Sequence, residues 1–209
     1  MTAKHCAHKC HDHHRRRLIF YCIAAFILLV LFVIFLVWVI LRPTKPQFVL
    51  RDATVYSFNV SASPPFTLST SLQITISAKN RMNRVGIYYQ KLDVYASYRG
   101  QQVTLPTMLP PTFQGHNDYT VWSPFMYGNS VPVWPGLMEA LQQDQNVGAV
   151  LLNIKIDGRL KWKVGTWFSS KYHLNVNCPA YIKFGGANTG IPFGPVMKFT
   201  LAQDCHVDV

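Results

Sequence analysis

The N-terminal segment holds the residues of this chain that most resemble a reactive site. From Lys4 to Arg17 it reads KHCAHKCHDHHRRR, so that Cys6 and Cys10 stand among five histidines. Thiolates and imidazoles are the usual ligands of zinc, and structural zinc sites arrange them as two close pairs separated by a folded spacer. This segment has no such spacer and no sequence that would build a core around a metal. A solvated basic tail is therefore the favoured interpretation, ahead of an ordered metal site.

A long apolar run follows this tail. The 24 residues from Leu18 to Leu41 contain no charged side chain, and as a helix they span about 36 Å, against about 30 Å for the hydrocarbon core of a bilayer. A cleaved signal peptide has an apolar stretch of only about 7 to 15 residues and then a small-residue cleavage site, whereas this run is followed by Arg42 and Pro43. The sequence therefore predicts an uncleaved transmembrane signal-anchor at residues 18–41, with the lipid bilayer as its partner.

The charges around the anchor predict its orientation. Five basic residues and one acid precede Leu18, and only Arg42 and Lys45 follow closely. Because the more positive flank stays in the cytosol, residues 1–17 are expected to form a basic cytosolic tail, and the rest of the chain is expected to lie in the lumen and finally outside the cell. The tail would then lie against anionic lipid, and Cys6 and Cys10 are candidates for reversible acylation.

The expected topology also determines which of the remaining candidate sites can be modified. Cys178 and Cys205 are the only cysteines outside in this topology, where oxidising conditions permit a disulfide between them; free thiols or an intermolecular link are the alternatives. Asn59-Val60-Ser61 is the one N-x-Ser/Thr sequon of the chain, and Asn59 is expected to carry a glycan on the same side. Both expectations depend on the orientation of the anchor.

The outer part of the chain is basic. The whole chain has a formal charge of +11, and from Arg42 onward 15 Lys and Arg stand against eight Asp and Glu, which leaves +7. Nucleic acid is a common partner of such surfaces, but the expected topology excludes it, and anionic polysaccharide or lipid head groups are the acidic partners within reach. Charges scattered for solubility are the favoured interpretation, because no outer segment is a basic run. Only four cations come near to forming a run, Lys155, Arg159, Lys161 and Lys163.

Prolines separate the anchor from the outer domain. The sequence Pro43-Thr44-Lys45-Pro46 cannot continue a helix, because proline lacks the backbone donor and restrains the residue before it. Residues 42–47 are therefore expected to form a stiff stalk, and residues 48–209 are long enough to form one domain.

Several segments of the outer domain alternate apolar and polar residues, the pattern of a strand with one buried face. The alternation is clearest at residues 72–79, 150–164 and 172–178. Asp157-Gly158 within the second segment is a two-residue hairpin signal, so we expect two strands there, and Arg99-Gly100 is expected to form another turn. Only residues 135–145 have helical spacing. The sequence predicts an all-β fold, an antiparallel β-sandwich with one short helix.

The outer domain offers no recognisable catalyst. Its acids form no motif at a defined spacing, its histidines are too far apart for a helical metal pair, and the glycine-rich stretch 185–190 lacks the ending of a phosphate loop. We therefore expect a protein that is not an enzyme and has no catalytic residue, cofactor, metal or small-molecule substrate. The large aromatic residues are expected in the core more than on a binding platform, the principal ones being Trp122, Trp134, Trp162, Trp167, Tyr88, Tyr89, Tyr95 and Tyr98.

Two stretches carry a family resemblance. The first is NRMNRVGIYY at residues 80–89, followed by YASYRGQ at 95–101, and the second is KWKVGTW at 161–167, followed by YHLNVNC at 172–178. Together with the basic tail, the anchor, the proline stalk and a cysteine near the end, they resemble the plant NHL family, the non-race-specific disease resistance and harpin-induced-like proteins. Their outer domain is of the group-2 late-embryogenesis-abundant type. The family often has Asn-Pro-Asn where this chain has Ala78-Lys79-Asn80.

The resemblance implies a fibronectin-like antiparallel sandwich, residence at the plasma membrane or plasmodesmata, no enzymatic activity, and a part in pathogen defence, including the hypersensitive response, or in stress response. Two functions compete. One is a membrane-anchored interaction module that meets a cell-wall polymer or another membrane protein. The other is a lipid-binding or lipid-transfer module that holds an apolar slot between its sheets and docks on acidic membranes. A cavity of about 300 Å³ or more between the sheets would favour lipid, and a filled core would favour the interaction module.

Overall fold

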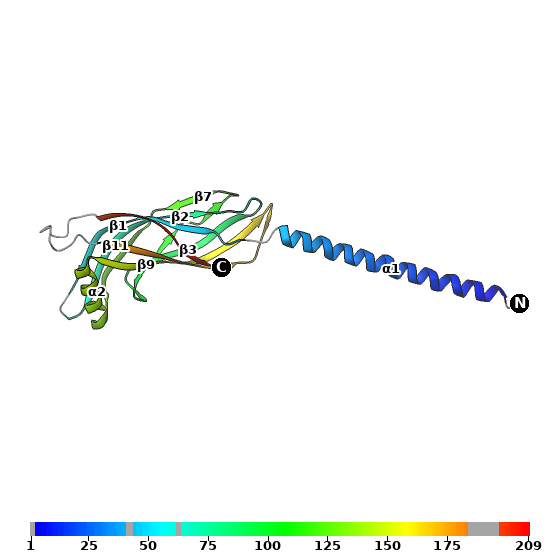
Figure 1. The fold of residues 1–209 in the computed structure, drawn as a ribbon, viewed down its shortest axis with the longest axis horizontal. Helices are drawn as coiled ribbons and strands as arrows, with labels where there is room; N and C mark the ends of the chain where they lie inside the picture. Colours follow the sequence, from blue (N-terminus) through cyan, green and yellow to red (C-terminus); the bar gives the residue numbers. More distant parts are fainter. Residues whose placement is uncertain (1–2, 41–43, 62–63, 184–196) are drawn as a thin grey trace. The chain divides into compact units, whose positions relative to one another are not determined.

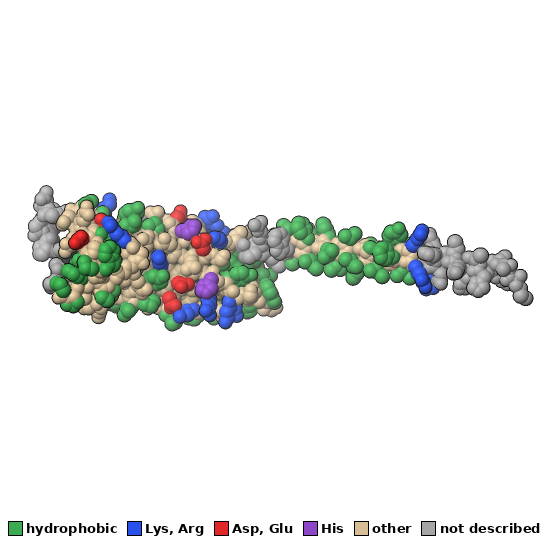
Figure 2. Space-filling model, turned by 90° about the horizontal axis from the view of Figure 1, so that it is seen from below, with side chains coloured by type: hydrophobic (Ala, Val, Ile, Leu, Met, Phe, Trp, Pro, Cys, Tyr) green, Lys and Arg blue, Asp and Glu red, His purple; other side chains and the backbone are tan. Residues whose placement is uncertain are grey.

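The chain forms two compact units, an N-terminal helix and a β-domain, in the computed structural model (Figure 1). The structure describes residues 3–40, 44–61, 64–183 and 197–209, without the side chains of residues 3–14, 38, 40 and 197–201. Helix α1 runs from Ala3 to Ile40, so it begins within the basic tail and well before the expected anchor. Its segment from Arg15 to Val37 contains an 18-residue window with a mean hydropathy of 3.2 and is long and apolar enough to cross a membrane. Apolar side chains cover most of this part of the helix in Figure 2.

The first sheet of the β-domain has five antiparallel strands in the order β12-β1-β2-β7, with β8 also paired to β2. Their bounds are β1 Gln47–Val60, β2 Thr67–Lys79, β7 Tyr119–Trp122, β8 Phe125–Pro132 and β12 Met197–Asp204. Strand β2 alternates as the sequence predicts, and Leu72, Ile74 and Ile76 are buried. Strand β1 instead has bulges after Leu50 and after Val55, and each bulge shifts which residues face inward.

The second sheet has eight antiparallel strands. Its order is β13-β11-β9-β3-β4, with β5 and β6 paired to β3 and β10 paired to β9. The bounds are β3 Gly86–Tyr98, β4 Gln101–Gln102, β5 Thr107–Leu109, β6 Thr112–Gln114, β9 Ala149–Val164, β10 Trp167–Phe168, β11 Tyr172–Lys183 and β13 His206–Asp208. The expected turn at Arg99-Gly100 is confirmed, because both residues have positive φ, 45° and 89°, as two-residue hairpin turns require.

The two sheets pack face to face, which confirms the predicted antiparallel sandwich (Figure 1). Phe48 of β1, Tyr89 of β3 and Trp122 of β7 meet between them: Tyr89 lies edge-on to Trp122 with ring centroids 5.5 Å apart, and Phe48 stacks on Trp122 at 6.4 Å. The short helix α2, Pro135–Val147, lies where the helical spacing predicts it. The residues that it buries are also those expected from that spacing, Leu137, Met138 and Leu141.

The hairpin expected at Asp157-Gly158 is wrong, because β9 runs through these residues without a turn. In a two-residue hairpin Ile156 and Arg159 would pair and face the same side, so the apolar positions would change from even to odd numbers across the turn. The buried apolar residues instead keep even numbers from Val150 to Trp162. Gly158 is itself buried, and a Cβ there would lie 2.2 Å from the carbonyl oxygen of Lys91. This glycine therefore permits the close approach of β3 rather than a turn.

The aromatic residues divide between core and surface. Tyr89, Trp122 and Trp162 are buried as expected, whereas Trp134 and Trp167 are 60% and 65% exposed, against the expectation that they belong to the core. Trp134 stands directly before α2, and Trp167 begins the two-residue strand β10. Both lie outside the long strands, so the alternation that buries Trp162 does not apply to them.

Candidate interaction surface

The two stretches that carry the family resemblance lie side by side in the structure. Strands β3 and β9 pair with Gly86 opposite Lys163 and Tyr88 opposite Lys161. Because neighbouring residues of a strand face opposite sides, these four positions share the outer face of the eight-stranded sheet. Three of them, Tyr88, Lys161 and Lys163, form a surface together with Phe113 and Phe168 from adjoining strands. We call these five residues the Lys163 cluster.

A lysine lies between two aromatic rings at the centre of this cluster. The ammonium nitrogen of Lys163 is 4.8 Å from the ring centroid of Phe113 and 5.4 Å from that of Phe168. Tyr88 packs edge-on against Phe168, with ring centroids 6.3 Å apart. The face of an aromatic ring carries partial negative charge, so each ring attracts the ammonium group, by about 0.5 to 1 kcal/mol at an exposed site. The rings therefore hold the charge of Lys163 in one place on the surface.

Four strands build the cluster. Phe113 comes from β6 and pairs opposite Tyr88 of β3, while Phe168 comes from β10 and pairs opposite Lys163 of β9. A Cβ at Gly86 would lie 2.8 Å from two ring atoms of Phe113. Glycine at this position therefore lets the Phe113 ring lie close over β3, within reach of the lysine.

A buried asparagine fixes the loops near the cluster. Asn80 is fully buried, and its Nδ2 donates to the carbonyl oxygens of Val85 and Gly115, both at 2.8 Å. Its Oδ1 accepts a hydrogen bond from the backbone N–H of Met82 at 3.0 Å. With both N–H donors and the oxygen acceptor of its amide hydrogen-bonded, Asn80 joins the loop before β3 to the turn after β6. It does so although Ala78 and Lys79 replace the Asn-Pro that often precedes this asparagine in the resembled family.

A second buried amide supports the same end of the sandwich. The Nε2 of Gln114 donates to the carbonyl oxygens of Ala78 and Asp118, at 2.8 and 2.9 Å. Its Oε1 accepts a hydrogen bond of 3.0 Å from the hydroxyl of Tyr89, whose pKa is raised by burial. Such a satisfied network orders the backbone on which Phe113 stands one residue earlier.

The cations of the cluster are available to a partner. Within the described part of the chain, neither Lys161 nor Lys163 forms an ion pair with a carboxylate. The turn of Gly165 and Thr166 joins β9 to β10 beside them and presents the exposed Trp167. A fixed ammonium group, a neighbouring lysine and exposed rings together suit an anionic ligand that also has an apolar face.

The sites predicted from the sequence lie elsewhere in the molecule. The side chain of Asn59 is exposed on β1, so it is accessible to a modifying enzyme. The side chains of Cys6 and Cys10, the acylation candidates, and the glycine-rich stretch 185–190 lie outside the described residues. Residues 135–145 and the strand at 172–178 support the core and take no part in the cluster.

Cys178 and Cys205 are joined by a disulfide, with their α-carbons 4.3 Å apart. Cys178 is a buried residue of β11 in the eight-stranded sheet, and Cys205 stands between β12 of the first sheet and β13 of the second. The disulfide therefore fastens the point at which the chain crosses from one sheet to the other.

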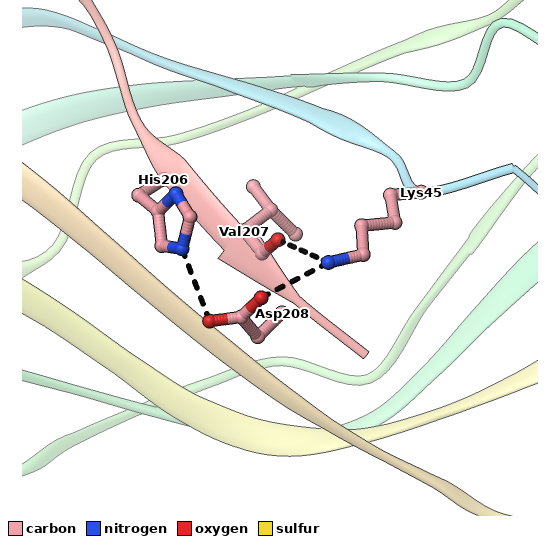
Figure 3. Close-up of polar contacts among 4 residues, drawn as sticks. All are labelled: Lys45, His206, Val207 and Asp208. Carbon is pink, nitrogen blue, oxygen red and sulfur yellow. Dashed lines mark hydrogen bonds and ion pairs between the residues drawn. The ribbon is translucent and has the colours of Figure 1, made fainter.

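The C-terminal strand has a second attachment, which Figure 3 shows. The Nζ of Lys45 donates to the carbonyl oxygen of Val207 and to Oδ1 of Asp208, both at 3.0 Å, and Nε2 of His206 lies 3.2 Å from Oδ2 of the same carboxylate. The hydrogen bond from Lys45, and then its charge and that of His206, hold the pKa of the Asp208 carboxyl below its usual range. Strand β13 is thus tied to the segment that precedes β1.

Sequence reasoning missed two members of the Lys163 cluster, Phe113 and Phe168. Each stands in a strand of two or three residues, too short to show a period, and each reaches Lys163 through sheet pairing rather than through closeness in sequence. The alternation of β9 was a usable signal for the lysines, because Lys161 and Lys163 flank the inward Trp162.

The part of the chain that contains the Lys163 cluster matches a known protein family. The sequence pattern of the family named late embryogenesis abundant protein matches residues 75–178, a range that contains every residue of the Lys163 cluster. Two proteins of Arabidopsis thaliana are similar over nearly the whole chain. NDR1/HIN1-like protein 1 is 51% identical over 203 residues, 95% of this chain and 97% of its own length. NDR1/HIN1-like protein 12 is 53% identical over 188 residues, 90% of this chain and 89% of its own.

One solved structure is also similar to this chain, but only weakly. The solution structure of a late embryogenesis abundant protein is 13% identical and covers 70% of this chain and 75% of its own, with a TM-score of 0.32. At this score the likeness carries no argument, and the fold rests on the sheet order and register described above.

Proposed function

Because the chain belongs to the NDR1/HIN1-like family and carries a late embryogenesis abundant domain, we propose that it is a membrane-anchored, non-enzymatic interaction protein of plant defence or stress response. In this proposal α1 crosses the plasma membrane with the N terminus in the cytosol. The β-domain acts outside, at the interface between membrane and cell wall, where it meets a wall polymer or another membrane protein. Plasmodesmata are included as a specialised part of the same membrane.

The exposed apolar surface of α1 is the observation that carries this proposal. None of its segment Arg15–Val37 is buried within the described structure, and its hydropathy is that of a membrane span. A helix that is apolar all round requires either a protein core or a bilayer around it. The three basic residues Arg15, Arg16 and Arg17 at one end of the apolar run support a cytosolic N terminus.

The β-domain supports an interaction role over a lipid-carrying one. At the aromatic cluster of Phe48, Tyr89 and Trp122 the space between the sheets is occupied by packed rings, where a lipid slot would need an opening. The outer face, by contrast, offers the Lys163 cluster, whose rings are exposed and whose lysines form no ion pair with any residue that the structure describes. Recognition at this surface is consistent with an anchored protein that binds a partner in place.

Protease treatment of intact cells tests the proposal. The full chain carries one epitope tag at each end, and cells without walls are treated with a protease that does not enter them. We expect loss of the C-terminal tag and survival of the N-terminal one. As a control, the double variant Leu28→Arg/Val30→Arg places charges in the middle of α1, at a cost of about 2.5 to 3.5 kcal/mol each in a bilayer, and should release the protein from membranes. A protected C-terminal tag in the wild type would refute the outer placement of the domain.

A further inference from the structure

We propose that the outer face of the eight-stranded sheet binds a linear, carboxylate-bearing polysaccharide along β9. This inference rests on the proposed function, because it requires the β-domain to lie outside the cell. It goes further by assigning the partner a chemistry and by naming the residues that recognise it.

Four cations line the outward side of β9. Because alternate residues of a strand face the same side, Lys155, Arg159, Lys161 and Lys163 project from one face, and at about 3.4 Å per residue their α-carbons extend over about 27 Å. All four side chains are at least partly exposed, and none forms an ion pair within the residues that the structure describes. A row of unpaired charges on one strand fits a polymer that repeats its own charges in one direction.

Two carboxylates share this face, Asp157 within the row itself and Asp93 directly opposite it on β3. Asp93 pairs with Lys91 at 2.9 Å, and Asp157 lies 3.8 Å from Nδ1 of the His173 imidazole. Lys91 is therefore a cationic partner for Asp93, whereas His173 can balance Asp157 only when its imidazole is protonated. The face is positive from Arg159 to Lys163, where three cations occupy successive outward positions of β9, and mixed in charge around Asp157.

Aromatic rings stand beside the cations at both ends of the row. Tyr95 pairs opposite Lys155, and Tyr88 pairs opposite Lys161, while Lys163 lies between the rings of Phe113 and Phe168. The face of a sugar ring presents C–H groups that pack on the negative face of an aromatic ring, and an ammonium group pairs with a sugar carboxylate. A sheet face on which rings from neighbouring strands stand beside the cations of β9 therefore suits both parts of an acidic sugar.

The layout favours a polymer over an acidic membrane surface. Proteins that bind a bilayer peripherally insert apolar side chains at a protruding edge and surround them with cations. Here the cations extend along a strand in the interior of a sheet, with β11 on one side and β3 on the other, and Lys163 is held by rings rather than free to extend. The exposed Trp167 of β10, which pairs opposite the last residue of β9, is the feature that a membrane would use, so anionic vesicles are included in the test.

The test uses the full chain in nanodiscs of phosphatidylcholine. Binding is measured to polygalacturonate and to the same polymer with its carboxylates fully methyl-esterified. We expect binding to the acidic polymer at least about tenfold tighter than to the ester, and a loss of about tenfold between 50 and 300 mM NaCl, because exposed charges are screened. Phe113→Leu/Phe168→Leu should weaken binding to both polymers.

Matched variants locate the site. Lys161→Gln/Lys163→Gln should weaken binding to polygalacturonate by about tenfold or more. Arg51→Gln/Lys79→Gln removes the same charge from the other sheet and should change the affinity by less than about twofold. Lys163→Arg keeps the charge and should retain binding, which guards against a misfolded glutamine variant. Thermal unfolding of each variant accompanies the binding measurements.

Several results of the binding measurements would overturn the inference. These are equal binding of the acidic and esterified polymers, equal losses in the two glutamine double variants, and binding to phosphatidylserine vesicles in place of polygalacturonate. If the β-domain proves to lie outside the cell and no polymer binds, the inference fails while the proposed function stands. If the domain proves to be cytosolic, the proposed function fails whatever the purified protein binds.

Discussion

The hydroxyl of Tyr98 in β3 donates a hydrogen bond of 2.6 Å to the carboxylate of Asp144 in α2. The guanidinium group of Arg99 donates to both oxygens of the same carboxylate, at 3.1 and 3.2 Å. Burial, and then the hydrogen bond with Asp144 and its charge, raise the pKa of Tyr98 to about 12. These contacts attach α2 to the end of β3 through a group that must stay protonated.

Stability is therefore expected to fall between about pH 10 and 12. The unfolded chain releases the phenol proton near pH 10 and the folded chain holds it to about 12, so the contribution of Tyr98 is complete below pH 10 and is lost as the pH rises through 12. Tyr98→Phe should lower the free energy of unfolding at pH 8 by about 1 to 3 kcal/mol and reduce the fall above pH 10. Denaturant unfolding of the detergent-solubilised protein at several pH values checks this, and equal pH slopes in the two proteins would contradict it.

The second prediction concerns Gly158. An alanine Cβ there would lie 2.2 Å from the carbonyl oxygen of Lys91 and 2.6 Å from Cδ2 of Leu92, so β3 and β9 would have to separate. We expect Gly158→Ala to lower the free energy of unfolding by about 2 kcal/mol or more, as overpacking in a core does. Asn153→Ala, at a half-exposed position of the same strand, is the matched control and should cost much less. A mild effect of Gly158→Ala would mean that the strands do not approach so closely.

The limits of the sequence-based fold prediction follow from backbone irregularities. Strand β2 was predicted correctly because its alternation is unbroken, whereas β1 contains bulges after Leu50 and Val55 that move the inward residues from even to odd numbers and back. At Asp157-Gly158 the local turn signal competed with the continuous alternation of β9, and the alternation was the better guide. Burial of a whole face outweighs a dipeptide preference, because reversing the register would expose every apolar residue beyond it.

The candidate surface was predictable only in part. The lysines of β9 were recognised as the nearest approach to a basic run, and alternation with Trp162 places two of them outward. Phe113 could not be found, because it lies about 50 residues from Lys163 and reaches it only through the pairing of β6 and β9 with β3. Contacts across a sheet depend on strand order, which periodicity does not contain.

Glycosylation at Asn59 is the third prediction and follows from its exposed side chain on β1 in a domain proposed to lie outside. Asn59→Gln should remove one glycan-sized shift in gel mobility from protein made in plant cells. Ser61→Thr keeps the sequon and should keep the shift, which separates loss of the acceptor from a general effect on folding. Wild-type mobility that does not respond to glycosidase would show that the site is unused.

The fourth prediction concerns the contact between Lys45 and Asp208 (Figure 3). Because Lys45 lowers the pKa of Asp208, the contact contributes to stability above the usual pKa of a carboxyl, and the contribution is lost as the pH falls through the lower, folded value. Lys45→Gln should return the pKa of Asp208 toward its usual range in an NMR titration. The stability difference from the wild type should narrow below about pH 4. An unchanged Asp208 titration would show that Lys45 does not bind this carboxylate in solution.

The last prediction concerns the disulfide between Cys178 and Cys205. The two cysteines are separated by 27 residues in the sequence. On the chain-entropy estimate, a disulfide that closes a loop of this size restricts the unfolded chain and so stabilises the fold by about 3 to 4 kcal/mol. It also holds the crossover between the sheets, where the backbone N–H of Cys205 donates to the carbonyl oxygen of Phe48 at 3.0 Å. We therefore expect either single Cys→Ser change to lower the thermal midpoint of the β-domain, with a loosened C-terminal strand β13.

A double variant separates the effect of losing the disulfide from the effect of changed packing around each cysteine. Once either cysteine is replaced the loop is already open, so Cys178→Ser/Cys205→Ser should cost little more than the worse single change, whereas two independent packing defects would add. The buried Cys178 should be the worse of the two, since a serine hydroxyl there lacks the thiol's tolerance of an apolar site. A non-reduced peptide map of the full chain from plant membranes provides the direct measurement. Recovery of the two cysteines in separate alkylated peptides would exclude the bond, and additive losses in the double variant would show that packing, rather than loop closure, holds the crossover.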